Sequence, residues 1–346
     1  TPRALEPNRP VIALARLVIP ADLPFSQPYW LRRRPLRGTF DVSDLALIGE
    51  AEGPPAVKAR ARVTIAGEPV SLELPVTFRW TDRVYGDRFR ALDVVPPVTA
   101  QLDQTAYLFA GSVAREVRLA LQSTRRAAEG LARLSLPAGW TSQPATIPFH
   151  LAPGAESVVR FRVTPAAGSA AESLAATIEV QGRATSSRLQ RIDQPHIPIQ
   201  TLLFPCESRV VHADVAHTGS TVGYLMGSGD QLPDALRQIG FTVTLLADDD
   251  VENLDLSRFD CIVAGVRAYN TRPRLRVLQA RLLEYVQNGG RLVVQYVTPE
   301  EALNDRLGPW PFKVSRDRVT VEDAEMRVLK PEHVLLNRPN RISSGD

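Results

Sequence analysis

The stretch that decides the fold is VGYLMGSGDQLPDALRQIGFTVTLL, residues 222–246. An apolar run leads into a glycine turn, and a helical segment then precedes a second apolar run. This order predicts a strand, a helix and a second strand, which is how a ligand-binding α/β domain begins. We expect Asp230 to be the N-cap of the helix and Gly240 to end it.

The same alternation continues towards the C-terminus. The runs FDCIVAGV and RLVVQYV predict two more strands, and RPRLRVLQARLLEYVQNGG predicts a helix between them that Gly289 ends. Strands that alternate with helices form parallel sheets. We therefore predict a flavodoxin-like or glutamine-amidotransferase-like α/β domain over residues 200–346, C-terminally incomplete.

The first 199 residues have a different pattern. Short runs such as KARARVTI and VSLELPVTFRW alternate with a period of two and are separated by proline and glycine. We predict an antiparallel β-sandwich over residues 1–98 and an immunoglobulin-like β-sandwich over residues 99–199. Trp140 is expected in the core of the second sandwich rather than on its surface as a sugar platform.

A candidate ligand site follows from the predicted parallel sheet. Ligands of such sheets bind beyond the carboxyl ends of the strands. The predicted strand ends offer Gly227, Ser228, Gly229, Asp230, Arg267, Tyr269, Asn270 and Tyr296. The glycine turn would supply backbone N–H groups, Arg267 an anion contact and the tyrosines stacking faces.

The motif at this turn is incomplete. Gly227 and Gly229 form the start of GxGxxG, but Leu232 stands where the third glycine belongs, and no GxxxxGK[ST] phosphate loop occurs. We favour a tight turn capped by Asp230 over a cofactor site. Flavodoxin-like hydrolases and amidotransferases place Cys or Ser after a strand, where this chain has Arg267 and Tyr296. We therefore predict no catalytic residue.

A weaker candidate is a metal site in HADVAH, where His212, Asp214 and His217 are three possible ligands within six residues. A surface strand that leads into a turn is the interpretation we favour. Cys206 and Cys261 belong to no CxxC pair; an inert core thiol is expected at Cys261, and a disulfide between the two is left open.

Composition narrows the function classes. The 346 residues carry 41 Lys and Arg against 38 Asp and Glu, a net charge of +3, with both signs interspersed. A nucleic-acid surface would concentrate its charge, and the one basic cluster, Arg32, Arg33, Arg34 and Arg37, is interpreted as a solvated turn. No stretch reaches the roughly 18 apolar residues of a membrane span. The chain looks like an internal piece of a longer protein, so its lack of a targeting segment is uninformative.

Several segments together carry a family resemblance. QPYWLRRRPLRGTFDV, VTFRWTDRVYGDRFRALDVVPPVTAQLD, HIPIQTLLFP and FDCIVAGVRAYNTRP, with the opening stretch, resemble the C-terminal half of large bacterial proteins of the PIG-L/LmbE deacetylase family. The resemblance implies an N-terminal zinc-dependent N-acetylglucosamine deacetylase domain with an Asp general base, followed by immunoglobulin-like modules and an amidotransferase-like domain. The HPDD-type motif of the catalytic domain is absent from these residues.

The resulting expectation is an accessory region that positions a catalytic domain outside this sequence, with zinc held in that domain. Carbohydrate or an anionic ligand is the expected partner, and secretion or a periplasmic location is expected by association with similar modules. Two alternatives stay open: the α/β domain is itself a hydrolase or amidotransferase-like enzyme, or the chain is a purely structural or interaction module.

Overall fold

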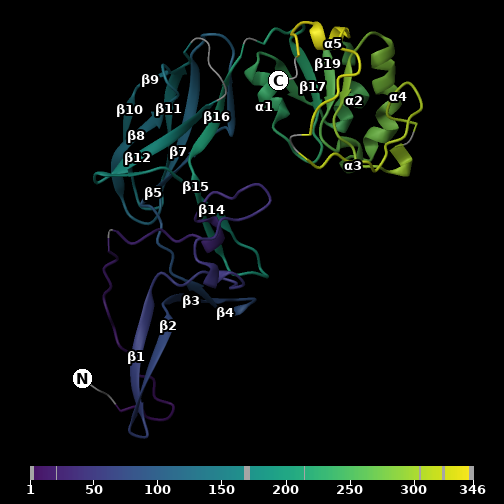
Figure 1. Cartoon of the computed structure of the whole chain (residues 1–346). Helices are drawn as coiled ribbons and strands as arrows, with labels where there is room; N and C mark the ends of the chain where they lie inside the picture. The colour runs from purple at the N-terminus through teal and green to yellow at the C-terminus, as the bar shows by residue number, and fades with distance from the viewer. Residues whose placement is uncertain are drawn as a thin grey trace.

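The computed structural model describes residues 4–20, 22–166, 172–213, 215–303, 305–321 and 324–342. The chain is elongated, with a narrow N-terminal part, a β-sandwich above it and an α/β part beside the sandwich (Figure 1). No helix in these ranges is long and apolar enough to cross a membrane.

The N-terminal part consists of two separate hairpins and two short 3-10 turns, η1 (Tyr29–Leu31) and η2 (Leu45–Leu47). Strand β1 (Lys58–Ile65) pairs antiparallel with β2 (Glu68–Pro75), and β3 (Thr77–Asp82) pairs with β4 (Gly86–Ala91). Each pair is a two-stranded sheet of its own. The predicted sandwich over residues 1–98 is therefore wrong.

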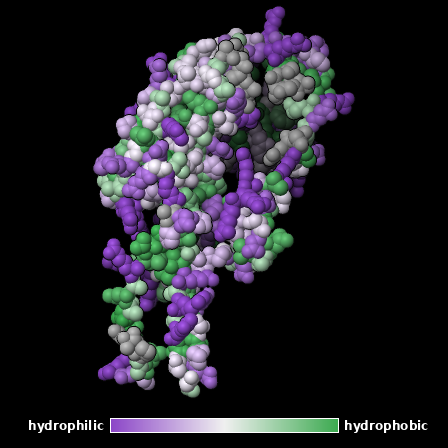
Figure 2. Space-filling model, turned by 60° about the vertical axis from the view of Figure 1, so that its left-hand side comes forward, coloured by the Kyte–Doolittle hydropathy of each residue, from purple (hydrophilic) through white to green (hydrophobic). Residues whose placement is uncertain are grey.

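The alternation with a period of two correctly predicted that both runs form strands, but VSLELPVTFRW divides into β2 and β3, which belong to different sheets. In β1–β2, Ala61 lies opposite Leu72 and Val63 opposite Val70, so one face of the hairpin is apolar. All residues of β2 remain exposed, however. Figure 2 shows hydrophobic side chains on the surface of this narrow lower end. Alternation identifies a strand with an apolar face, but it does not say whether a second sheet covers that face.

The next part is a two-sheet sandwich. One sheet has the order β5-β7-β11-β9, and the other has the order β10-β8-β12-β16-β6, with β13 paired to β12. The strands of the first sheet are β5 (Val98–Leu102), β7 (Arg115–Ser123), β11 (Glu156–Thr164) and β9 (Thr141–Gln143). Those of the second are β10 (Thr146–Leu151), β8 (Ala128–Ser135), β12 (Glu172–Val180), β16 (Glu207–His212), β6 (Ala106–Phe109) and β13 (Arg183–Thr185).

A single apolar core joins the two sheets. Leu119 and Phe161 of one sheet and Leu174 of the other are fully buried in it. Trp140 is buried and meets Phe109 edge to face at 4.8 Å between ring centroids, which confirms its predicted core position. The sandwich expected in this region is thus present, although β16 extends it beyond residue 199 and pairs in parallel with β6.

A long hairpin leaves the sandwich and reaches the N-terminal part. Strands β14 (Ser187–Ile192) and β15 (Gln200–Pro205) pair antiparallel. The Gln27 side chain exchanges hydrogen bonds with the backbone of Leu203, at 2.7 and 2.8 Å. The expected boundary at residue 200 therefore falls inside this hairpin.

The α/β part has a four-stranded parallel sheet in the order β18-β17-β19-β20. Its strands are β17 (Thr221–Leu225), β18 (Thr242–Leu245), β19 (Cys261–Ala264) and β20 (Leu292–Val294), each paired in parallel. The helical segments are α1 (Leu232–Gln238), α2 (Asp248–Asn253), η3 (Leu256–Arg258), α3 (Ala268–Thr271), α4 (Arg274–Gln287), η4 (Glu301–Leu303) and α5 (Val334–Asn337).

Alternate side chains of the strands enter two different cores. Leu225 and Ile262 pack with residues of α2 and α4, whereas Tyr224 and Val263 pack with residues of α1. Helices therefore cover both faces of the sheet, as a fully apolar strand pattern requires. Helix α4 buries Leu275, Leu278 and Leu282, as its spacing predicts.

The sandwich and the α/β part meet along helix α1. Gln238 accepts a hydrogen bond from Leu108 N at 2.7 Å, and the Thr105 hydroxyl donates to Gln231 Oε1 at 2.6 Å. Strand β6 of the sandwich thus contacts the helix that follows the glycine turn.

Candidate functional site

The glycine turn after β17 packs directly on the turn after β19. A side chain at Gly227 would place its Cβ 2.0 Å from the carbonyl oxygen of Val266. The Ser228 N–H donates to this same oxygen at 2.9 Å, and the Ser228 hydroxyl donates to it at 3.2 Å. Glycine is needed at 227 for close contact between two backbone segments, and the contact already engages Ser228.

Asp230 ties this turn to the sheet. Its Oδ1 accepts from the Tyr224 hydroxyl at 2.7 Å and from Leu232 N at 3.0 Å, and its Oδ2 accepts from Val266 N at 3.4 Å. The predicted N-cap is displaced by one residue, because Gln231 is the residue before the helix. Burial and the Asp230 carboxylate both raise the pKa of Tyr224, so this hydroxyl stays protonated as a donor.

Arg267 occupies an unusual position after β19. Its backbone is left-handed, with φ 58° and ψ 23°, and its N–H donates to the carbonyl of Tyr296 at 2.7 Å. Left-handed residues other than glycine are uncommon and occur at sharp strand-to-helix turns that carry nucleophiles. Here the side chain on the turn is an exposed guanidinium, which cannot act as a nucleophile.

Asn270 holds the segment that follows β20. Its amide nitrogen donates to Thr298 O at 3.1 Å and to Glu300 Oε1 at 2.6 Å, while its oxygen accepts from Thr298 N at 2.9 Å. The bond from Asn270 is the largest influence that lowers the pKa of Glu300, with Arg276 adding to it. The Asn270 amide is therefore satisfied by protein groups.

The two tyrosines differ in their surroundings. Tyr269 is 1% exposed and its hydroxyl bonds Gln279, so its ring offers no stacking face, contrary to the prediction. Burial raises its pKa to about 12. Tyr296 is 55% exposed, and its carbonyl meets Arg267. Of the predicted stacking faces, only Tyr296 stands open to solvent.

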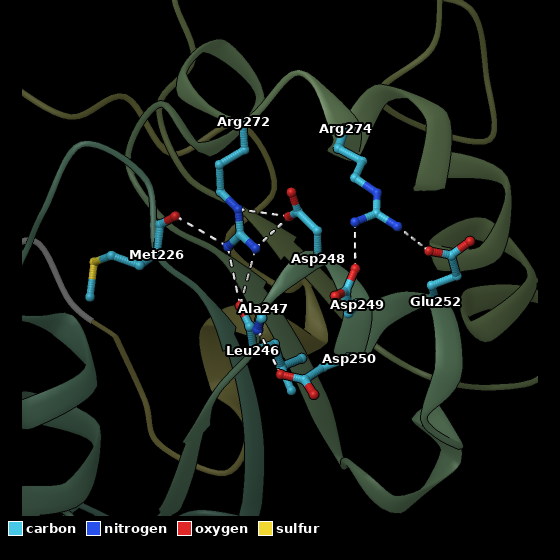
Figure 3. A network of polar contacts seen from close by, with 9 residues as sticks. All are labelled: Met226, Leu246, Ala247, Asp248, Asp249, Asp250, Glu252, Arg272 and Arg274. Carbon is cyan, nitrogen blue, oxygen red and sulfur yellow. Dashed lines mark hydrogen bonds and ion pairs between the residues drawn. The ribbon is translucent and has the colours of Figure 1, made fainter.

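One further arginine lies at this edge and was not predicted from the sequence. The Arg272 guanidinium donates to the carbonyl oxygens of Met226, at 3.3 Å, and Leu246, at 3.2 Å, and it pairs with Asp248 at 2.5 Å (Figure 3). The Arg272 side chain therefore joins the carboxyl end of β17 to that of β18. The only signal in the sequence was an arginine soon after a strand end, which resembles many surface arginines.

The carboxyl edge thus brings together the turn 227–230, Arg267, Asn270 and the backbone of Tyr296. Most polar groups at this edge of the sheet hydrogen-bond to one another. The Arg267 guanidinium makes no hydrogen bond among the described residues, although its charge is among the causes that lower the pKa of Glu300.

The weak metal candidate is not assembled by its described members. His212 Nε2 lies 2.9 Å from Gly111 O, whereas His217 Nδ1 lies 3.0 Å from Gly219 O and its ring packs on Phe241. Asp214 lies outside the described residues. Within those residues, no group of three His, Cys, Asp or Glu is arranged to hold a metal ion. Cys206 and Cys261 are both free thiols.

Comparisons with known proteins identify one module. Residues 112–183 match the family model described as "NPCBM-associated, NEW3 domain of alpha-galactosidase". These residues lie in the sandwich and span strands β7 to β12, so the similarity to this module falls on the two-sheet part of the chain. No curated protein matches the chain.

A similar solved structure is the native conformation of E. coli alpha-2-macroglobulin. It is 19% identical, with a TM-score of 0.24, over 53% of this chain. The match spans only 12% of the length of that protein. Neither comparison supports the resemblance to PIG-L deacetylases.

Proposed function

We propose that this chain is a non-catalytic accessory region of a carbohydrate-active enzyme. The observation that carries the proposal is the NEW3 match over residues 112–183, whose description links the module to a glycosidase. The absence of a nucleophile at the left-handed turn of Arg267 adds support, because this is where a catalytic α/β domain would place one.

We further propose that the complete protein is a PIG-L-type deacetylase of N-acetylated amino sugars. The support is the sequence resemblance alone. Zinc and the Asp general base would belong to a catalytic domain outside this sequence, which would be this region's own partner. The described residues of this chain do not fit zinc, since they assemble no three suitable ligands.

We assign the C-terminal part to a flavodoxin-like, amidotransferase-like domain. The strand order β18-β17-β19-β20 is the start of the flavodoxin order, with helices on both faces. The proposed division is an N-terminal hairpin region, a sandwich and this α/β domain. Carbohydrate-associated modules of this kind favour a secreted or periplasmic location.

The first alternative, an independent hydrolase, would use Ser228 in the glycine turn as its nucleophile. Its hydroxyl donates to a backbone carbonyl, and no histidine among the described residues hydrogen-bonds to it. A serine needs an adjacent base to attack a carbonyl carbon. We therefore prefer the accessory role and keep Arg267 as the anchor of an anionic ligand at the strand ends.

Arg267→Ala tests that anchor. Phosphate binding to the chain, followed by nuclear magnetic resonance, is expected to weaken about tenfold when the bidentate contact is lost. The matched control is Arg83→Ala, which removes an exposed arginine of the N-terminal part. Equal affinity in Arg267→Ala and wild type would remove the strand-end site from the proposal.

The accessory role is tested on the complete protein. The reading frame upstream of Thr1 is sequenced, and deacetylation is measured for the complete protein and for a form that ends before this region. We expect the full protein to act faster on N-acetylglucosamine oligomers than the shortened form, with similar rates on the monosaccharide. A frame that starts near Thr1, or an upstream domain of unrelated chemistry, would contradict the deacetylase assignment.

A further inference from the structure

A cavity of about 860 Å³ lies between the N-terminal segment and the sandwich. One wall comes from residues 24–35, and the other comes from β5, β14, β15 and β16. Phe25, Leu31 and Phe204 contribute apolar surface to it. Its volume is within the range of small-molecule sites, roughly 300–1,000 Å³.

Arginines dominate the charge of this cavity. Arg32, Arg33, Arg34 and Arg188 line it, and Glu207 is the one acidic residue among its lining residues. The basic cluster interpreted from the sequence as a solvated turn is exposed, as expected. The fold adds what the sequence does not show: it brings Arg188 of β14 to the same cavity.

These arginines differ in how far they are already neutralised. Arg33 pairs with Asp41 through two contacts of 3.1 and 3.0 Å, and Arg34 lies 3.7 Å from Glu207. Among the described residues, Arg32 has no carboxylate partner, and Arg188 instead lies over the Phe204 ring at 5.0 Å. At least two guanidiniums therefore face the cavity with uncompensated charge.

The geometry points to a binding site for an anionic oligosaccharide, one that carries carboxylate or sulfate groups. Arginine pairs bidentately with either group. The aromatic and aliphatic wall provides a surface on which the apolar face of a sugar ring packs. Because the lining of this cavity holds a single carboxylate, an anionic group that enters it meets little competing negative charge.

The choice of a saccharide rests on the carbohydrate-related role proposed above. A nucleic acid would fit the arginines but not the remainder of the molecule, whose charge is +3 overall with both signs interspersed. The strand-end site at Arg267 is separate, since none of its residues lines this cavity.

The test is calorimetric titration of the whole chain with four defined ligands. These are an oligogalacturonate, a heparin-derived oligosaccharide of similar length, a neutral chitin oligosaccharide and a single-stranded DNA of matched charge. We expect an acidic saccharide to bind, and its affinity to fall about tenfold or more in Arg32→Glu and in Arg188→Gln. Arg62→Ala, an exposed arginine of β1 outside the cavity, is the control and should bind as wild type does.

Comparison of the two acidic saccharides identifies the anionic group, carboxylate or sulfate. Binding should also weaken as salt rises from about 50 to about 200 mM, because charge pairing is screened. Arg32 is exposed, so its substitution leaves folding intact and keeps the test valid if Arg188→Gln unfolds. The proposal is overturned by no binding, by equal binding of the neutral oligosaccharide or DNA, or by an Arg62→Ala defect as large as that of Arg32→Glu.

The result is independent of the deacetylase assignment. Arginine-dependent binding in a protein whose upstream domain is not a deacetylase would keep this site and reject that assignment. Faster deacetylation of oligomers without any binding of acidic saccharides would support the deacetylase assignment and reject this binding site.

Discussion

Arg272 and Arg274 lie two residues apart, yet their guanidiniums have different surroundings. The side chain of Arg272 is 19% exposed and contacts Asp248 and two strand-end carbonyls, whereas that of Arg274 is 49% exposed and pairs with Asp249 and Glu252 (Figure 3). The first links β17, β18 and the α3–α4 segment. The second joins only the surfaces of α2 and α4.

This contrast predicts unequal effects on stability. Arg272→Ala leaves a partly buried Asp248 without its partner and should lower the free energy of unfolding of the α/β part by about 2–4 kcal/mol. Arg274→Ala removes an exposed pair and should cost less than about 1 kcal/mol. Urea denaturation followed by far-ultraviolet circular dichroism measures both, since the described α-helices all lie in this part. Equal losses in the free energy of unfolding would mean that the Arg272–Asp248 pair contributes no more than an exposed surface pair.

The contact between the two turns gives a second prediction. Gly227→Ala would force a methyl group against the Val266 carbonyl, which is backbone and cannot rotate away. We expect a loss of about 1–3 kcal/mol, as for overpacked cores. Gly53→Ala, where a methyl group meets nothing within 4 Å, is the control. If both variants unfold at the same urea concentration, the turn after β17 is not packed as described.

The sequence predicted the four strands of the α/β part and its two longest helices, because apolar strand runs and an amphipathic helix have distinctive patterns. Leu275, Leu278 and Leu282 recur on one face of α4 and are all buried. Residues 1–98 were harder to interpret. Ala61 and Leu72 alternate as sandwich residues do, yet the hairpin stands alone, since period alone does not determine what packs on a face.

The candidate site was predicted only in part. Parallel strands place their carboxyl ends together, so the proximity of the turn at 227 to Arg267 followed from topology. The topology did not predict which side chains already hydrogen-bond to neighbouring protein groups. Tyr269 is buried, and Arg272 reaches back across two strands, and both facts depend on tertiary packing that local sequence does not encode.

Cys206 gives a prediction about reactivity. The thiol is 2% exposed, and burial raises its pKa to about 11, so little thiolate forms near neutral pH. A disulfide-exchange reagent should leave Cys206 unmodified in the folded protein and modify it in denaturant. Mass spectrometry of the modified peptides separates it from Cys261, which is less buried. Rapid native labelling of Cys206 would show that the sandwich opens readily.

Asp260 gives a prediction about pH. Its Oδ2 accepts from Ser220 N at 2.7 Å, from Thr221 N at 2.9 Å and from the Thr221 hydroxyl at 2.8 Å. These hydrogen bonds, with the backbone bonds as the larger cause, lower its pKa from 3.8 to about 2. A carboxylate with a depressed pKa stabilises the folded state above its unfolded pKa, and this contribution is lost as pH falls through the folded value.

Asp260→Asn should therefore be less stable than wild type at neutral pH, because all three hydrogen bonds end on one oxygen and an amide oxygen accepts them without the negative charge that strengthens them. The difference should persist down to about pH 4 and shrink between pH 3.8 and about 2, as wild-type Asp260 becomes protonated. Denaturation of both proteins across this range measures the difference, and Asp305→Asn, on a turn far along the chain, serves as the control. A difference that stays constant from neutral pH to pH 2 would show that the Asp260 charge does not stabilise the start of β17.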